Sequence, residues 1–433
     1  MPYIVKNKKR ITYTIEKGKV IFSDGKIAIP DTDNIDVAVA WDLADDAPIV
    51  VTPPVVVPNP QPTPVFASVG SGSGFLDLGV IKDAKLKIKA GTYDGLNIKS
   101  AVSCIIDATD VLIKKGGLNI DSFDGLELFG LAFVDAEYRA ININNLSNNI
   151  HLHHVSFKNV SNYTIRYGNQ TLFDGTEATK SKNWKLDSLT FDNTGQAFNA
   201  AGGVEPDGTR NLMSNFTFTN STIKNCPGIG DCVYIGAVEN YNFSGNTIDN
   251  VNTANNEHNG LFHVIGNGVA NNNKATNHQG NLVRAWGISF GKNVANITLS
   301  GNTAYNSRKY GALELQCPPY LDKIIKDNPG KYNYTNAKVF NNTGGQLNTN
   351  NDWDGQMLDL YYTGGTTEYY NNLGFDMKRF TGSAAVKDGI TNMINLGNDK
   401  LIDKGGNKYF QTQAQAVTDT KTLRSLHTGI GAQ

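Results

Sequence analysis

Apolar and polar residues alternate in short runs along most of the chain, and residues typical of tight turns separate the runs. The runs are rich in Val, Ile, Phe, Tyr and Thr, whereas helix-favouring residues are sparse over 240–306. Alternation with a period of two is typical of strands that bury one face. Asparagine, abundant between the runs, tolerates the left-handed backbone angles of tight turns. The pattern therefore predicts many short strands joined by sharp bends.

The runs also repeat. Two similar octets, FSGNTIDN and LSGNTAYN, occupy 243–250 and 299–306. Related strand segments recur every 24 to 34 residues or so, and they end in turn at Asp135, Asn159, Asn193, Asn225, Asn250, Asn277 and Asn306. Such a period indicates a solenoid, and repeats of strands without helices predict a β-helix in which each repeat is one coil. We expect the recurring asparagines to stack as a ladder, each bonded to the neighbouring coils.

The chain divides into three parts by composition. Residues 1–47 contain alternating strands and predict a small N-terminal β unit, which we expect to attach the protein to something larger. Residues 48–66 hold seven of the 14 prolines and predict an extended, semi-rigid linker. Residues 67–433 carry the repeats, so we expect one β-helix there. The fold class is thus all-β.

Charge and hydropathy exclude several classes of function. Lys and Arg number 39 against 40 Asp and Glu, so no basic field predicts nucleic-acid binding. No stretch approaches the roughly 18 apolar residues of a membrane span, and the first residues lack the apolar core of a classical signal peptide. We expect either a removed signal or another route out of the cell. Four scattered cysteines are too few for a disulfide framework, with a Cys226–Cys232 pair as the minority alternative.

A second column of residues emerges when the strands that follow the asparagine wall are stacked. The segments GDCVYIG (230–236), GLFHVIG (260–266), NLVRAWG (281–287), GALELQ (311–316) and GQMLDLY (355–361) place apolar residues in two inward columns. Between these columns, facing outward, we expect Tyr234, His263, Arg284, Glu314 and Asp359, with coils about 4.8 Å apart. The same register extends to Asn199, Arg166 and Asn142. The next outward column offers Trp286, Gln316 and Tyr361.

Polar residues are expected on any solvated sheet face, so this column could be a plain surface. However, structural ladders tend to repeat one residue type, and this column repeats none. Three functions fit it. In β-elimination, Tyr234 and His263 serve as acid and base while Arg284 neutralises a uronate carboxylate. In hydrolysis, Glu314 and Asp359 form the required carboxylate pair, with Glu205 and Asp207 as a second choice.

In pure binding, the third function, Trp286 and Tyr361 stack on sugar rings and no bond is cut. Elimination fits slightly better than hydrolysis. No cofactor is required. We expect no metal at the HLHH segment, because His151 and His153 share one strand face without an evident carboxylate nearby. A calcium loop at Glu205–Asp207 is a minor alternative.

Two further features border the column. Arg308 and Lys309 follow an asparagine turn, where they either close over an acidic glycan or form a solvated turn. The segment 317–335 leaves the coil after Glu314, and its apolar and basic residues are spaced for a short helix that walls one side of the strip. Tyr320, Ile324 and Ile325 supply the apolar side of that helix, and Lys323 and Lys326 the basic side.

The segment IKAGTYDGLNIKS (88–100) resembles the first coil of the right-handed parallel β-helix, pectate-lyase-like superfamily, and the final LHTGIGAQ resembles its closing segment. The resemblance implies a right-handed helix, but this fold carries lyases, hydrolases, epimerases and adhesins, so it does not decide activity. A β unit, proline linker and β-helix together resemble a bacteriophage tail spike or similar appendage. That layout implies an extracellular or virion-surface location, assembly through 1–47 and the possibility of an oligomer.

The sequence therefore predicts a polysaccharide-recognising protein, with a lyase favoured over a hydrolase if it is an enzyme. A non-catalytic receptor-binding appendage and a secreted glycoside hydrolase are the alternatives. The partner is a polysaccharide or cell-surface glycan in each case. Which glycan it binds, and whether a bond is broken, stay open at this stage.

Overall fold

The computed structural model describes strands between Tyr3 and Ala44, and residues 65–254, 258–350, 355–361, 364–377, 393–396 and 400–415. The chain separates into two compact units, Met1–Pro64 and Val65–Gln433. Residues 48–64 of the predicted linker and the closing LHTGIGAQ segment lie outside the described residues. None of the helices within the described ranges is long and apolar enough to cross a membrane.

The first unit is an antiparallel sheet, which agrees with the alternation of residues 1–47. Its strands follow the order β4-β3-β2-β1-β5. They are β1 (Tyr3–Lys6), β2 (Lys9–Glu16), β3 (Lys19–Phe22), β4 (Ile27–Ala28) and β5 (Leu43–Ala44).

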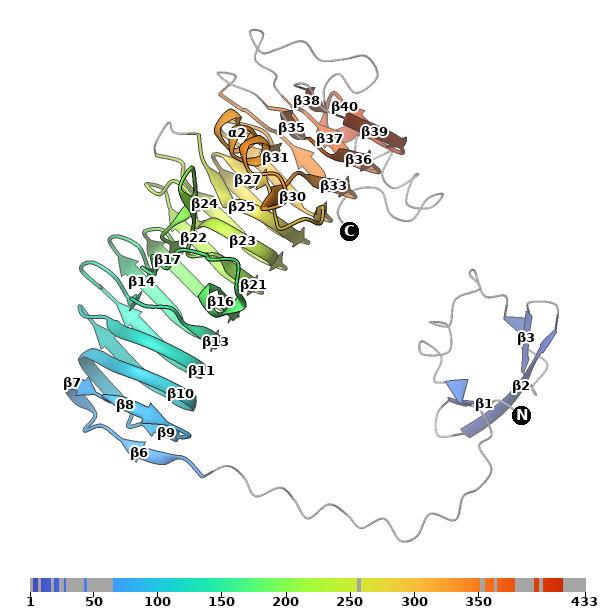
Figure 1. Ribbon diagram of the computed structural model, residues 1–433. Helices are drawn as coiled ribbons and strands as arrows, with labels where there is room; N and C mark the ends of the chain where they lie inside the picture. Colours follow the sequence, from blue (N-terminus) through green and yellow to red (C-terminus); the bar gives the residue numbers. More distant parts are fainter. Residues whose placement is uncertain are drawn as a thin grey trace. The chain divides into compact units, whose positions relative to one another are not determined.

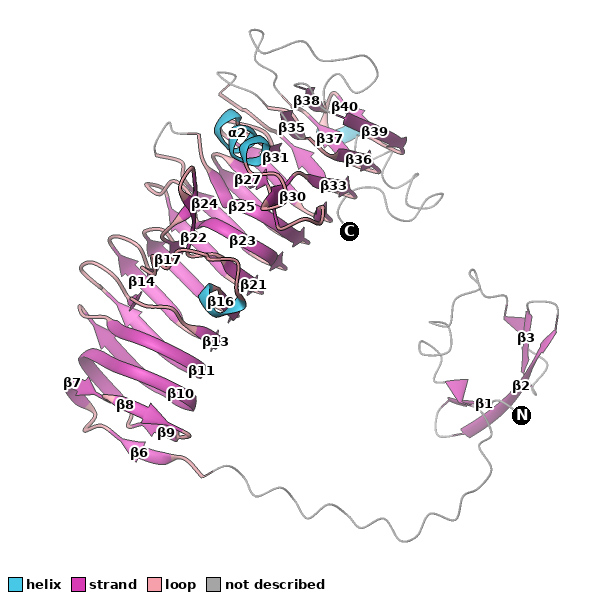
Figure 2. Cartoon of the chain, in the orientation of Figure 1, coloured by secondary structure: helices cyan, strands magenta, loops and turns pink. Residues whose placement is uncertain are grey.

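The second unit is a parallel β-helix, as the repeats predicted (Figure 1). Its first coils are formed by β6 (Ala67–Val69), β7 (Ser73–Asp77), β8 (Val80–Lys82), β9 (Lys85–Ile88), β10 (Gly91–Lys114) and β11 (Leu118–Val134). Beyond them, each strand pairs in parallel with the corresponding strand of the next coil, and these pairings build three walls. Strands far outnumber helices along this unit (Figure 2).

The first wall carries the predicted polar column. It contains β12 (Ile141–Ile143), β15 (Ile165–Tyr167), β18 (Phe198–Ala200), β23 (Val233–Ser244), β25 (Gly260–Asn271), β27 (Asn281–Gly287), β31 (Leu313–Gln316), β35 (Leu358–Tyr361) and β38 (Ile394–Leu396). Strands β23 and β25 are long and continue around the bend into the second wall.

The second wall is completed by shorter strands on either side of β23 and β25. These are β13 (Asn148–His153), β16 (Ser181–Asp187), β21 (Met213–Thr219), β29 (Ala295–Ser300), β33 (Thr335–Phe340), β36 (Thr366–Tyr370) and β39 (Lys400–Gly405).

The third wall carries the asparagines found in the repeat. It contains β14 (Ser156–Val160), β17 (Thr190–Thr194), β22 (Thr222–Cys226), β24 (Thr247–Val251), β26 (Lys274–His278), β30 (Thr303–Ser307), β34 (Thr343–Gly345), β37 (Leu373–Phe375) and β40 (Lys408–Phe410).

The predicted asparagine ladder is confirmed, with a variation. Asn193 donates to Asn159 at 2.9 Å, and Asn306 donates to Asn277 at 2.7 Å. Asn225 donates instead to Asp192 of the preceding coil. Every asparagine of the ladder has a positive φ, between 51° and 56°. Asparagine recurs here because it tolerates this left-handed geometry and still bonds the next coil.

A second asparagine ladder, which the repeat analysis missed, lies in the buried core. Asn246, Asn273, Asn302, Asn342 and Asn372 are all at most 2% exposed. Each amide donates to the next member at 2.8 to 3.1 Å, ending at Asn407. These bonds satisfy amides that would otherwise be costly to bury.

The outer face of the first wall is partly covered. Helix α2 (Pro319–Asp327) lies beside β27 and β31 (Figure 1). Its Leu321, Ile324 and Ile325 pack in an apolar cluster outside the coil, together with residues of the wall such as Ile265 and Ile288. The helix predicted within 317–335 is thus confirmed. Tyr320, assigned to its apolar side, is instead 42% exposed.

Two strand pairs and a single-turn helix complete the described structure. Strands β19 (Gly203–Glu205) and β20 (Gly208–Arg210) form one antiparallel pair, and β28 (Ser289–Phe290) and β32 (Tyr332–Asn333) form another. A single-turn helix, η1, spans Glu177–Thr179.

Candidate functional site

The pairing register of the first wall is the one predicted from the sequence. Tyr234 pairs with His263, His263 with Arg284, Arg284 with Glu314, and Glu314 with Asp359. The upward extension through Asn199, Arg166 and Asn142 is also observed. Trp286, Gln316 and Tyr361 form the adjacent column. A one-residue slip would have turned the whole column inward, so this register places the polar side chains together outside the coil.

The column is nevertheless much less exposed than predicted. Glu314 is completely buried, Asp359 is 4% exposed and His263 is 7% exposed. The prediction of an open strip facing a ligand freely was therefore wrong for these three. Side chains outside the coil cover them: the α2 cluster includes Trp286, and His258 reaches Glu314 from a loop. The burial of a carboxylate then requires partners.

Glu314 has those partners. Its Oε1 accepts from Arg284 Nε at 2.7 Å and from Trp286 Nε1 at 3.2 Å, while its Oε2 lies 3.0 Å from His258 Nε2. Burial alone would raise the pKa of this carboxyl, but His258 and Arg284 outweigh it and lower the pKa to about 2. A carboxyl that stays ionised cannot act as the general acid of a glycosidase. Glu314 is better understood as the counter-ion of Arg284.

His263 is paired with a carboxylate from the preceding coil. Its Nδ1 lies 3.1 Å from Asp231 Oδ2, and Asp231 also accepts from the backbone N–H of Gly260 at 2.9 Å. Its Nε2 is buried and has no hydrogen-bond partner among the described residues. A carboxylate at Nδ1 fixes the proton there and leaves Nε2 with a lone pair. This is the tautomer required of a general base.

Two aromatic rings flank His263. Tyr234 contacts it edge-on with ring centroids 5.2 Å apart, and Trp286 does so at 4.8 Å. Burial and the nearby Asp231 and Glu205 carboxylates raise the pKa of Tyr234, so its hydroxyl keeps its proton at neutral pH. Tyr234 therefore holds a proton that it would give only to a strongly basic oxygen, such as a leaving alkoxide.

Trp286 connects this pair to α2. Its ring meets that of Tyr320 at 5.9 Å, and the Arg284 guanidinium lies 5.1 Å from its centre. A partly exposed tryptophan beside an exposed tyrosine offers flat apolar surface of the kind that stacks on sugar rings. The sequence predicted Trp286 as a site residue. It did not predict Asp231, although this residue lies in the segment GDCVYIG (230–236), and it did not predict His258.

The other predicted site residues are further from this chemistry. Asn199 donates to Gln196 at 2.8 Å and accepts from Arg166 at 2.8 Å, so its amide is already engaged. Lys309 is only 6% exposed and lies over Tyr310, which contradicts the solvated-turn interpretation. Gln316 and Tyr361 are partly exposed in the column next to Glu314 and Asp359.

Two minor alternatives can be assessed. Both oxygens of Asp207 accept from Arg210, at 2.8 and 2.5 Å, so the β19–β20 turn already neutralises the carboxylate proposed for calcium. All four cysteines lie in the described part of the chain and are free thiols, so the Cys226–Cys232 disulfide is not formed.

The histidine segment has a partner that the sequence did not reveal. Glu127 pairs with His151 across neighbouring coils, and His153 Nε2 lies 3.2 Å from Glu127 Oε1. The expectation that no carboxylate is nearby was therefore wrong, because Glu127 is distant in sequence but adjacent across β11 and β13. Burial, followed by His153 and Lys185, lowers the pKa of His151.

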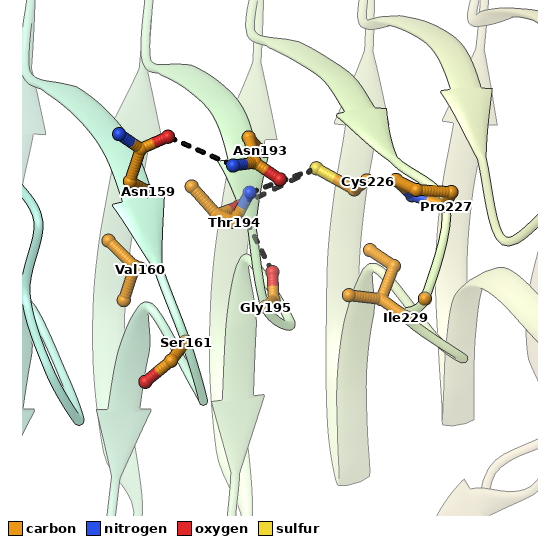
Figure 3. Close-up of a pocket in the computed structure, with 10 residues that line it drawn as sticks. Asn159, Val160, Ser161, Asn193, Thr194, Gly195, Cys226, Pro227 and Ile229 are labelled. Atoms are coloured by element: carbon orange, nitrogen blue, oxygen red, sulfur yellow. Dashed lines mark hydrogen bonds between the residues drawn. The ribbon is translucent and has the colours of Figure 1, made fainter.

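Two hollows lie away from the column. One, of about 450 Å³, is lined by the third wall and the loop that follows it, including Asn159, Thr194, Cys226 and Ile229 (Figure 3). The other, of about 660 Å³, lies along the second wall and is lined by residues such as Asn242, Asn271 and Thr298. Among the described residues that line them, neither hollow has a histidine or a carboxylate.

Comparisons with known proteins add little. No protein-family model matches the sequence, and no curated protein matches it. Among solved structures, a polysaccharide lyase of family PL6 from Pseudopedobacter saltans aligns with a TM-score of 0.37 and 12% identity over 85% of this chain and 92% of that chain. A similarity this slight carries no inference.

Proposed function

We propose that the protein binds an acidic polysaccharide over Tyr234, His263 and Trp286 and cleaves it by β-elimination. The observation that carries the proposal is the Asp231–His263 pair, which leaves a lone pair on Nε2 beside a protonated tyrosine. The hydrolytic alternative loses support because Glu314 is buried as an ionised counter-ion.

The proposed reaction assigns one role to each side chain. His263 Nε2 removes the proton from the ring carbon that bears the uronate carboxylate. The electron pair forms a double bond to the neighbouring carbon, whose bond to the glycosidic oxygen breaks. The Tyr234 hydroxyl then gives its proton to that leaving oxygen. His263 gains one proton and Tyr234 loses one in each turnover. Solvent then takes the proton from His263 and returns one to Tyr234.

The surrounding residues would orient the sugar. Trp286 and Tyr320 supply stacking surface, and Arg284 supplies hydrogen-bond donors. Because Glu314 compensates the charge of Arg284, the guanidinium would orient the sugar through hydrogen bonds more than it would attract the uronate carboxylate by its charge. His263 Nε2 is buried in this structure, and the Tyr234 and Trp286 rings both pack edge-on against His263, so a flanking side chain must shift before a sugar can reach this nitrogen.

The test is a panel of acidic and neutral polysaccharides, read for near-ultraviolet absorbance and for new reducing ends. Elimination produces both signals, whereas hydrolysis produces only reducing ends. His263→Ala and Tyr234→Phe should each lower turnover by about 10²-fold or more. Tyr305→Phe removes a hydroxyl from the third wall and is the matched control. Absorbance that persists unchanged in both site variants would contradict the assignment.

Non-catalytic recognition is the second candidate, and one observation favours it: the atom proposed as the base is buried. In that case, the protein would bind a glycan without producing either signal. Trp286→Ala would still weaken binding, because stacking does not depend on turnover.

We also propose that residues 1–47 attach the β-helix to a particle or cell surface, outside the cell. The support is the layout, in which a proline-rich segment separates a small sheet from a long solenoid. Deleting residues 1–65 should abolish assembly while glycan binding persists. If the protein is instead a free secreted enzyme, the same deletion should change neither its localisation nor its glycan binding.

A further inference from the structure

We infer that Glu127, His151 and His153 form a binding site for a divalent transition metal, of which zinc fits best. One ligand atom from each residue lies within 4.8 Å of the other two. The site is on the outer face of β11 and β13, in coils that precede the candidate glycan site, and it does not depend on the proposed function.

The strand register explains why these three side chains converge. Glu127 and His151 are direct partners in neighbouring coils, and His153 is two residues further along the same strand face. The His151 and His153 rings lie 4.2 Å apart. Because parallel strands hold this spacing rigidly, the cluster is built by the fold rather than by a mobile loop.

The donor atoms are available to a metal. His151 Nε2 is buried and has no hydrogen-bond partner among the described residues. An unpartnered buried nitrogen is costly unless something binds it. His153 Nε2 is 3.2 Å from Glu127 Oε1, which is close to the separation of two ligands around one tetrahedral zinc ion. Without metal, a proton bridges these two atoms, so metal binding displaces that proton.

Neighbouring residues support the required tautomer. His153 Nδ1 lies 2.8 Å from His154 Nδ1, so His153 can donate its second N–H to His154 while Nε2 coordinates the metal. Metal-binding histidines usually have such a second partner. Phe129 stacks on His153 with a centroid distance of 5.0 Å and holds the ring in place.

Two imidazoles and one carboxylate favour zinc, cobalt, nickel or copper over calcium and magnesium, which prefer oxygen ligands. Two charged residues of the next coil also face the cluster. Lys185 pairs with His151 and opposes a cation, whereas Asp187 pairs with His153 but is engaged by Thr219 and Asn220. Three protein ligands leave a fourth position for water or an anionic group.

Titration calorimetry of the full chain with Zn²⁺ should show one site, and titration with Ca²⁺ should show none there. His151→Ala, His153→Ala and Glu127→Gln should each weaken zinc binding by about tenfold or more. Lys185→Gln should strengthen it, and Glu137→Gln, an exposed carboxylate outside the cluster, is the matched control. Binding unaffected by the three ligand variants would overturn the inference.

A second measurement applies if any variant fails to fold. Crystals of the unaltered protein grown with zinc should give an anomalous peak between Glu127, His151 and His153. A peak only at other histidines, or no peak at all, would also overturn the inference. Neither outcome bears on the glycan site, which shares no residue with this cluster.

Discussion

Replacing Glu314 with glutamine tests the assignment of this residue as a structural counter-ion. The change keeps the side-chain shape and removes the charge that holds Arg284, His258 and Trp286. Folding lowers the pKa of Glu314 from 4.5 to about 2. At about 1.4 kcal/mol per pKa unit, the folded protein is more stable by about 3 kcal/mol with this carboxyl ionised than with it protonated. Loss of one partner from a buried ion pair typically costs a similar amount, about 3–5 kcal/mol.

The pH dependence has a definite sign. The folded pKa is lower than the unfolded one, so this stabilisation is complete well above pH 4.5 and disappears as the pH falls towards 2. Glu314→Gln should therefore lose about 3 kcal/mol at pH 7. The difference from the unaltered protein should shrink by about half by pH 3.

Urea unfolding at pH 7 and pH 3 measures both quantities. Glu368→Gln is the matched control, because Glu368 also pairs with a cationic side chain, that of Lys404 at 2.7 Å, but on the solvated face of β36. Its unfolding midpoint should hardly change. If Glu314→Gln unfolds at the same urea concentration as the unaltered protein at pH 7, or if the difference is the same at both pH values, Glu314 is not the structural counter-ion of Arg284.

Three other predictions follow from the described side chains. Asn302→Ala should lower the free energy of unfolding by about 2–3 kcal/mol because it breaks the buried ladder. Asn306→Gly on the exposed ladder removes the side-chain bond to Asn277 but keeps the positive φ accessible, so it should cost about 1 kcal/mol; equal thermal shifts would contradict this. Asp231→Asn should lower turnover at least tenfold and change its pH profile, since the amide no longer fixes the His263 tautomer; an unchanged profile would argue against the pair. The four buried cysteines should resist a thiol reagent until urea unfolds the protein, and rapid labelling of the native protein would show that a coil opens locally.

The fold and the strand register were predictable because the same sequence pattern recurs in successive coils. An asparagine that must adopt a positive φ marks each turn of the third wall, and alternation within each strand then determines which side chains point outward. Five strands aligned on these two rules placed Tyr234 and Asp359 in one column. A register error of one residue would have placed charged side chains in the core.

The environment of the column could not be predicted in the same way. Glu314 is buried by His258 and Trp286, and neither contact follows from strand periodicity. Asp231 and Glu127 were missed for a related reason, because each has its partner on the next coil. Asp231 contacts His263, 32 residues away, and Glu127 contacts His153, 26 residues away. Strand pairing determines which side chains meet across neighbouring coils. The repeat does not determine where loops and inserted helices place their side chains, because those positions depend on packing.

A crystal structure of Tyr234→Phe soaked with an acidic oligosaccharide would show whether the sugar binds over His263 and Trp286. We expect a sugar ring stacked on Trp286, with the hydrogen of the carbon that bears the carboxylate directed at His263 Nε2. A sugar bound instead in the hollow lined by Asn159 and Ile229, with Trp286 untouched and still packed on His263, would contradict this expectation.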